Sequence, residues 1–210
     1  MKLGLIAISA LALSACVGGG GGFGGGYWLA EASQERKVGD GGMYVTPPRD
    51  WNRASRSIIT SVREVEDWTL NGPYLDGISF VSGLKEGEAL VDQRRKATRQ
   101  VPEFKADMLA PEVASMIESF FRSRAGAIEF VDIELKPRQF MGYPGFQYDY
   151  DHLDGDEVWR RGRVVGAVIG DRLYFIMLDA ARSHYFDAAL PDFEAIVESA
   201  RLSAKRASNA

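Results

Sequence analysis

The sequence predicts an α+β domain in which α-helices cover an antiparallel β-sheet. Two observations support this fold class: short apolar strands separated by turns fill the C-terminal half, and amphipathic helical patterns occur at 111–124 and 191–200. With 210 residues, of which 46% are hydrophobic and 11% aromatic, the chain can build one core of ordinary size. We therefore expect one domain with appendages.

The first residues resemble a bacterial lipoprotein leader. Lys2 precedes an apolar run over 3–13, which is too short to span a bilayer as a permanent helix. The motif Leu13-Ser14-Ala15-Cys16 that follows is similar to a lipobox, in which a peptidase cuts before a lipid-modified cysteine. We predict a signal peptide at 1–15 and a mature chain that begins at Cys16. The alternative is an ordinary signal peptide followed by a free cysteine.

Cys16 is the single cysteine, so no disulfide can form within the chain. Because one acyl chain holds a protein only marginally, the two or three chains on a lipoprotein cysteine would make a stable membrane anchor. Val17, the next residue, is not aspartate, which resembles an outer-membrane address. We therefore expect attachment to a bacterial membrane, with the outer membrane facing the periplasm favoured.

Residues 16–42 read as a flexible tether. The run VGGGGGFGGG at 17–26 is too glycine-rich to hold a regular element, and ten such residues span roughly 17 Å root-mean-square. A phosphate-binding loop would need a Gly-Lys-Ser/Thr ending, which this run lacks. Residues 27–42 are expected to form a loosely ordered entry segment.

The folded domain is predicted over 43–203, with a disordered tail at 204–210. Its first half should contain strands at 43–45, 57–65 and 77–84, a turn at Asn71-Gly72-Pro73, and a short helix at 87–100.

The clearest element is the helix at 111–124. Pro111 suits a first helical position, and Gly126 suits the residue after a helix end. One apolar stripe runs along it at i, i+3, i+4, i+7 and i+8, formed by Val113, Met116, Ile117, Phe120 and Phe121.

Four strands and a helix follow. The strands are expected at 127–135, with Val131, Ile133 and Leu135 on one face, and at 146–150, 158–169 and 172–179. Gly170-Asp171 forms a hairpin turn, and the continuous apolar run at 173–178 predicts a central strand covered on both faces. The last helix should start at Pro191-Asp192, with Phe193, Ile196, Val197 and Ala200 as its buried stripe.

Several of these pieces occur together in one fold type. They are Pro47-Pro48 with Trp51, the segment GYPGF at 142–146, the strand LYFIM at 173–177 with Ala180-Ala181 and Phe186, and the helix FEAIVESA at 193–200. This order resembles the PsbP-like fold, an α/β/α sandwich shared by bacterial lipoproteins of unassigned role, over residues 43–203. The chain departs from that pattern at 68–100 and at the acidic segment 149–157. The resemblance implies a binding or assembly role, by analogy of fold.

The acidic segment contains five carboxylates in nine residues, which are hard oxygen ligands of the kind calcium binds. They are Asp149, Asp151, Asp154, Asp156 and Glu157. The EF-hand order is broken, because Leu153 and Arg160 occupy the third-ligand and twelfth positions counted from Asp149. We therefore favour a solvated hairpin turning at Asp154-Gly155 and assign no metal or cofactor.

No catalytic motif is present. His152 and His184 are the two histidines, and neither G-x-S-x-G nor H-E-x-x-H occurs. Ser183-His184 with Asp179 or Asp187 is a weak triad candidate, against a surface histidine that begins a helix. Basic clusters at 94–99 and 160–163 are interpreted as solvated faces, with contact to anionic headgroups as the alternative. We expect no enzymatic activity and no catalytic residue.

The formal net charge of −4 gives no electrostatic reason to expect nucleic-acid binding. The leading hypothesis is a lipid-anchored periplasmic protein that acts as a non-enzymatic binding or assembly component of the envelope, with an envelope protein as partner. One alternative is a carrier of a small apolar ligand or lipid, held in a cleft between sheet and helices. Another is a hydrolase of an unrecognised type.

Overall fold

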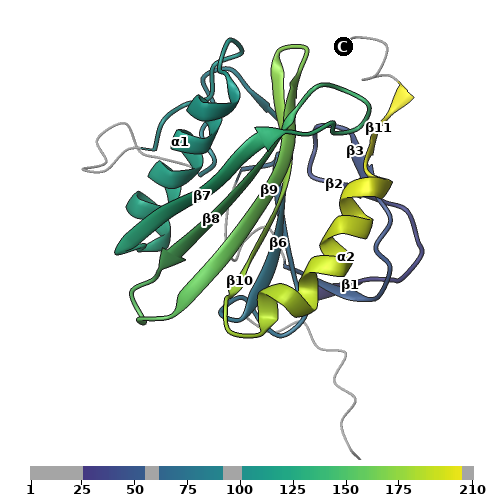
Figure 1. Cartoon of the computed structure of the whole chain (residues 1–210). Coiled ribbons are helices and arrows are strands. Elements are labelled where there is room, and N and C mark those ends of the chain that lie inside the picture. Colours follow the sequence, from purple (N-terminus) through teal and green to yellow (C-terminus); the bar gives the residue numbers. More distant parts are fainter. Residues whose placement is uncertain (1–25, 55–61, 92–100, 205–210) are drawn as a thin grey trace, which may run out of the picture.

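The computed structural model describes residues 26–54, 62–91 and 101–204, and it contains an eight-stranded antiparallel sheet with one α-helix against each face (Figure 1). The strand order is β1-β4-β5-β6-β10-β9-β8-β7. Its strands are β1 (Tyr27–Ala30), β4 (Trp51–Ala54), β5 (Val65–Thr69), β6 (Asp76–Lys85), β7 (Glu129–Pro137), β8 (Phe146–Leu153), β9 (Trp159–Ile169) and β10 (Arg172–Ala181). The predicted combination of an antiparallel sheet with two helices is confirmed. Cys16 and residues 92–100 lie outside the described residues.

A second, three-stranded sheet packs beside the first. It consists of β2 (Arg36–Val38), β3 (Met43–Val45) and β11 (Arg201–Leu202), in the order β11-β3-β2. The fold therefore begins before the predicted boundary at Met43. In the expected entry segment, β1 pairs with β4, and Ala30 and Val38 are fully buried. Pairing with β4 and β3 and the burial of Ala30 and Val38 stabilise these strands, although the segment is rich in glycine.

Helix α1 (Ala110–Phe120) forms where the apolar stripe predicts it. Glu112 accepts the backbone N–H of Leu109 at 2.7 Å, which satisfies one of the free donors at the helix start. A π-helical turn over Phe121–Ala125 extends the helix, and Gly126 ends it with a φ of 77°. The buried face comprises Val113, Ala114, Met116 and Ile117.

Helix α2 (Tyr185–Ser199) starts earlier than predicted. Its first turn begins after His184, and Pro191 lies inside the helix instead of at its start. A proline usually marks a helix beginning because it lacks an N–H. Here burial outweighs that preference, because Phe186 and Ala189 extend the stripe of Phe193 by two turns towards the N-terminus.

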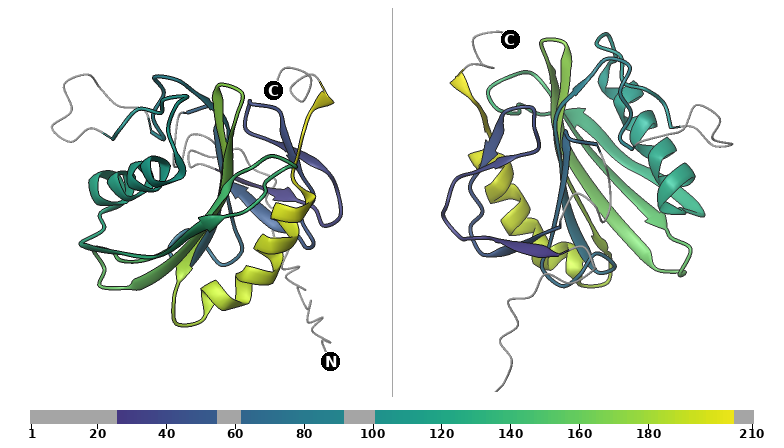
Figure 2. Two further views of the ribbon diagram at one scale, coloured as in Figure 1. Left: turned by 45° about the horizontal axis from the view of Figure 1, so that its top comes forward. Right: turned by 180° about the vertical axis from the view of Figure 1, so that it is seen from behind.

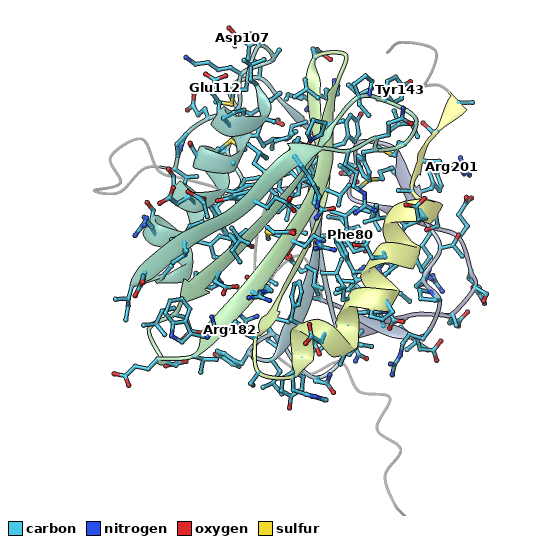
Figure 3. All side chains as sticks on the ribbon, viewed as in Figure 1. Phe80, Asp107, Glu112, Tyr143, Arg182 and Arg201 are labelled. Atoms are coloured by element: carbon cyan, nitrogen blue, oxygen red, sulfur yellow. The ribbon has the colours of Figure 1, made fainter. Side chains whose placement is uncertain are left out.

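Each face of the sheet has its own core. On one face, α2 packs over Phe80, Ile176 and Leu178; Phe80 lies between the sheet and α2 in Figure 3. On the other face, α1 packs over Val81, Phe175 and Tyr150. Figure 2 shows the two helices on opposite sides of the sheet. Strand β10 lies between β6 and β9, and residues 173–178 are buried, as the sequence predicts.

Three other local predictions are wrong. Residues 87–91 form turns and bends where a helix is expected. The strand expected at 57–65 is found at Val65–Thr69 instead, because 62–64 lie outside any strand and 57–61 lie outside the described residues. In β7 the register shifts between Asp132 and Glu134. This bulge places Val131 opposite Asp151 and Leu135 opposite Tyr148, which lie on opposite sheet faces.

Candidate functional site

A cavity of about 490 Å³ lies between α1 and strands β5, β6 and β10, and is called the α1 cavity below. Its volume falls within the range of small-molecule sites. Most of its wall is apolar. The apolar side chains of the described residues around it include Val65, Val81, Leu90, Ile117, Phe120, Phe121, Phe175 and Met177. The α1 cavity therefore provides a preformed, concave and mainly apolar surface, which is the main requirement for binding an apolar ligand.

A carboxyl–hydroxyl pair stands in this apolar wall. Asp67 on β5 and Ser79 on β6 are directly opposite in the sheet, and Ser79 Oγ donates to Asp67 Oδ1 at 2.5 Å. Both residues line the α1 cavity. Burial raises the pKa of Asp67 to about 6, against the opposing effect of the Ser79 hydrogen bond and with a smaller contribution from the charge of Glu66. Above pH 6 the carboxylate offers a ligand hydrogen-bond acceptors, and below pH 6 its protonated form also offers a donor.

A buried charged cluster closes one end of the α1 cavity. Asp179 on β10 binds Arg160 Nε through Oδ1 at 2.5 Å and His152 Nε2 through Oδ2 at 2.8 Å. Arg160 also donates to the backbone carbonyl of Tyr74 at 2.7 Å. Burial raises the pKa of Asp179, but the hydrogen bond from His152 and the charge of Arg160 outweigh it and hold this pKa below its ordinary value.

His152 takes part in that cluster as a packed core residue. It is 2% exposed, and its ring lies 4.6 Å from the ring of Phe121. Asp179 thus pairs with His152, whereas the weak triad candidate pairs it with His184. His184 is exposed and precedes α2, as expected for a surface histidine that begins a helix.

Asp76 organises the turn at the rim of the same cavity. Its Oδ1 accepts hydrogen bonds from the Thr69 hydroxyl at 2.8 Å, from Leu70 N–H at 2.7 Å and from Asn71 N–H at 3.2 Å. These bonds fix the connection between β5 and β6. They hold Tyr74, which also lines the α1 cavity, at its rim.

The carboxylates of the acidic segment are separated by the strand. Asp149 and Asp151 lie in β8 and not in a loop. Asp149 binds Arg163 through two hydrogen bonds, and Asp151 binds both Arg161 and Arg182.

The remaining three acidic residues belong to the hairpin between β8 and β9. Asp154 Oδ1 accepts the backbone N–H groups of Asp156 and Val158, which forms the turn, and Glu157 adopts a positive φ of 61°. Over the described ranges 26–54, 62–91 and 101–204, no group of three or more potential metal ligands is close enough to hold an ion.

Sequence reasoning missed Asp67 and Ser79. Each is a single polar residue within a strand, and only the register of β5 against β6 brings them together. The available signal was their position: both alternate with buried neighbours, Trp68 and Phe80, so both face the side opposite those residues.

The fold is similar to that of a solved protein. The solution structure of cyanobacterial PsbP (CyanoP) from Synechocystis sp. PCC 6803 matches with a TM-score of 0.53 over 89% of this chain and 99% of that chain. The chain has a PsbP-like fold. At 16% sequence identity this match shows the fold alone.

A PsbP-like fold over most of the chain agrees with the resemblance drawn from the sequence. LpqN, described as involved in cell envelope biogenesis of Mycobacterium tuberculosis, matches with a TM-score of 0.34 and 10% identity over 85% of each chain, which is too weak to support an argument. No family model and no curated protein matches the sequence. Among the described residues, no helix is both long enough and apolar enough to cross a bilayer.

Proposed function

We propose that the protein is a membrane-anchored, non-enzymatic component of the bacterial envelope that binds a small, mainly apolar ligand in the α1 cavity. Anchoring would occur through Cys16, with the outer membrane facing the periplasm as its location. The observation that carries the proposal is the apolar cavity with the Asp67–Ser79 pair in its wall. This arrangement is typical of ligand sites, in which a few polar groups orient an otherwise apolar molecule.

The wall composition specifies the class of ligand. The apolar side chains favour an alkyl or aromatic body, and the neutral or ionised Asp67 carboxyl favours a hydroxyl, amide or amine group. Each methylene that enters the cavity should contribute about 0.8 kcal/mol, or roughly fourfold in affinity.

The proposal is tested by filling the cavity. Val81 lies in its wall and is buried, so Val81→Phe should occupy part of the volume and weaken binding of the apolar fluorophore N-phenyl-1-naphthylamine by about tenfold or more. Val131→Phe on β7 is the matched control, because Val131 is exposed and does not line the cavity. Equal binding by wild type and a folded Val81→Phe variant would refute the proposal.

A role in assembly is the second candidate. Strand β7 is an edge of the large sheet, and Val131 and Ile133 on it are 41% and 49% exposed. An exposed edge can pair with a strand of another protein. Crosslinking in cells through β7 should capture one specific envelope protein if this function holds, and repeated recovery of none would count against it.

A further inference from the structure

We propose that edge strand β1, together with Tyr74, docks on the surface of the lipid bilayer and places the mouth of the α1 cavity against it. The proposal deepens the proposed function by identifying the bilayer as the source of the ligand. Only this identification of the ligand source rests on the proposed function. The docking surface is defined by four exposed side chains: Tyr27, Trp28, Leu29 and Tyr74.

These side chains are unusually exposed for their type. Tyr27 is 43% exposed, Trp28 63%, Leu29 49% and Tyr74 81%. Large apolar residues are normal singly on a surface, but contiguous groups mark interaction sites. Tyr27 and Tyr74 line the same cavity, so the strand and the turn lie together at its rim.

The register shows how this edge would approach a flat surface. Tyr27 pairs with Ala54, Trp28 with Arg53 and Leu29 with Asn52. One edge of β1 is therefore hydrogen-bonded to β4, and its other edge is the edge of the sheet. Successive side chains point to opposite faces of a strand. Tyr27 and Leu29 therefore project from the sheet face that carries the cavity, and Trp28 projects from the opposite face. A flat surface that approaches the sheet edge-on would contact all three side chains.

The chemistry of the edge fits a bilayer better than a protein strand. Natural edge strands are commonly protected by charged residues, whereas β1, with the sequence YWLA, has none. Tryptophan and tyrosine are favoured at the level of lipid headgroups, where one end of the ring is apolar and the other is wet. By contrast, the opposite edge β7 interleaves its apolar residues with Glu129, Asp132 and Glu134, which anionic lipids would repel.

The position of β1 along the chain supplies the second argument. Nine residues lie between Cys16 and Gly26, and the ten Cα–Cα steps that join them reach at most about 36 Å when fully extended. If Cys16 carries lipid, β1 is the described element nearest to the bilayer along the chain. Figure 1 shows β1 at the lower end of the molecule.

Docking can be tested without depending on lipidation in the cell, because Cys16 is the single thiol. The mature chain, coupled through Cys16 to a maleimide phospholipid, would be placed on vesicles of phosphatidylethanolamine and phosphatidylglycerol with brominated acyl chains. Of the four tryptophans, Trp51 and Trp68 are buried, and Trp159 in β9 is half-buried beneath the guanidinium of Arg182. Trp28, which is 63% exposed, is therefore the principal reporter at the docking surface. We expect its emission to be quenched on brominated vesicles, and Trp28→Tyr to remove at least half of that quenching.

Two double variants provide the matched comparison. Leu29→Ser with Tyr74→Ser should reduce the quenching at least twofold, while Val131→Ser with Ile133→Ser on β7 should leave it unchanged. All four positions are exposed, so the variants should fold. Equal quenching in wild type and Trp28→Tyr, or equal losses in the two double variants, would overturn the proposal. Binding of N-phenyl-1-naphthylamine without vesicles measures the cavity alone, so failure of docking and failure of the proposed function are distinguishable.

Discussion

The Asp67→Asn substitution should stabilise the protein above pH 6 and have little effect near pH 4. Asp67 faces the α1 cavity, and burial raises its pKa from 3.8 to about 6. Because the folded state holds the proton more tightly than the unfolded state, the unfolded chain releases it first as the pH rises. Between pH 3.8 and 6 the wild type therefore loses stability that the neutral asparagine does not lose.

The size of the effect follows from these two values. A difference of about two pKa units at 1.36 kcal/mol each gives about 3 kcal/mol. For a protein of this size, 1 kcal/mol shifts the melting temperature by roughly 2–4 °C, so Asp67→Asn should melt roughly 6–12 °C above wild type at pH 7.5. Asparagine retains the oxygen that accepts the Ser79 hydrogen bond, so little else changes.

Thermal unfolding of both proteins at several pH values between 4 and 8 provides the assay. The difference between the two melting curves removes the titration of all other groups that they share. Asp156→Asn, in the exposed hairpin between β8 and β9, controls for the loss of one negative charge. A difference that stays constant across this pH range, or one that grows towards low pH, would refute the raised pKa of the half-buried Asp67 carboxyl.

Three further outcomes are expected. Asp76→Ala should lower the free energy of unfolding by roughly 3 kcal/mol in urea titrations, since it leaves four donors of the β5–β6 turn without their acceptor. A loss below roughly 1 kcal/mol would contradict that role. Gly162→Ala should cost roughly 1–3 kcal/mol or more, because its Cβ would lie 2.0 Å from the Tyr150 ring, whereas Gly155→Ala, with its nearest atom 3.9 Å away, should be close to neutral in the same titration. Isothermal titration with calcium should show no binding heat, because Arg163 and its neighbours already pair with the strand carboxylates, and a saturable heat would revive the calcium hypothesis.

The fold is predicted best where burial has a strong period. The stripe of α1 and the apolar run of β10 are visible without knowledge of any partner, because each is set by the sequence of one element. Prediction fails where tertiary contacts decide. Strand β1 forms because it pairs with β4. Helix α2 includes Pro191 because burial of the apolar stripe that starts at Phe186 outweighs the low helix propensity of proline.

The candidate site is harder to predict because it depends on register. Asp67 and Ser79 are twelve residues apart in the sequence. They lie opposite each other because β5 and β6 pair in a register that also sets Val65 opposite Val81. In the same way, Asp179 on β10 pairs with His152 on β8, across the intervening β9, and not with His184, which is nearer in the sequence. Residue types alone could not choose between these pairings.

The unequal packing of the two sheet faces explains why the cavity occurs where it does. On the α2 face, the strands carry large side chains such as Trp68 and Phe80, which lie 4.6 Å apart between ring centres and fill the space beneath the helix. At the neighbouring positions that face α1, the same two strands carry Asp67 and Ser79. Small and polar residues facing an eleven-residue helix leave volume that apolar neighbours then enclose. The alternation of β5 and β6 therefore places large apolar side chains on the α2 face and the α1 cavity on the other face.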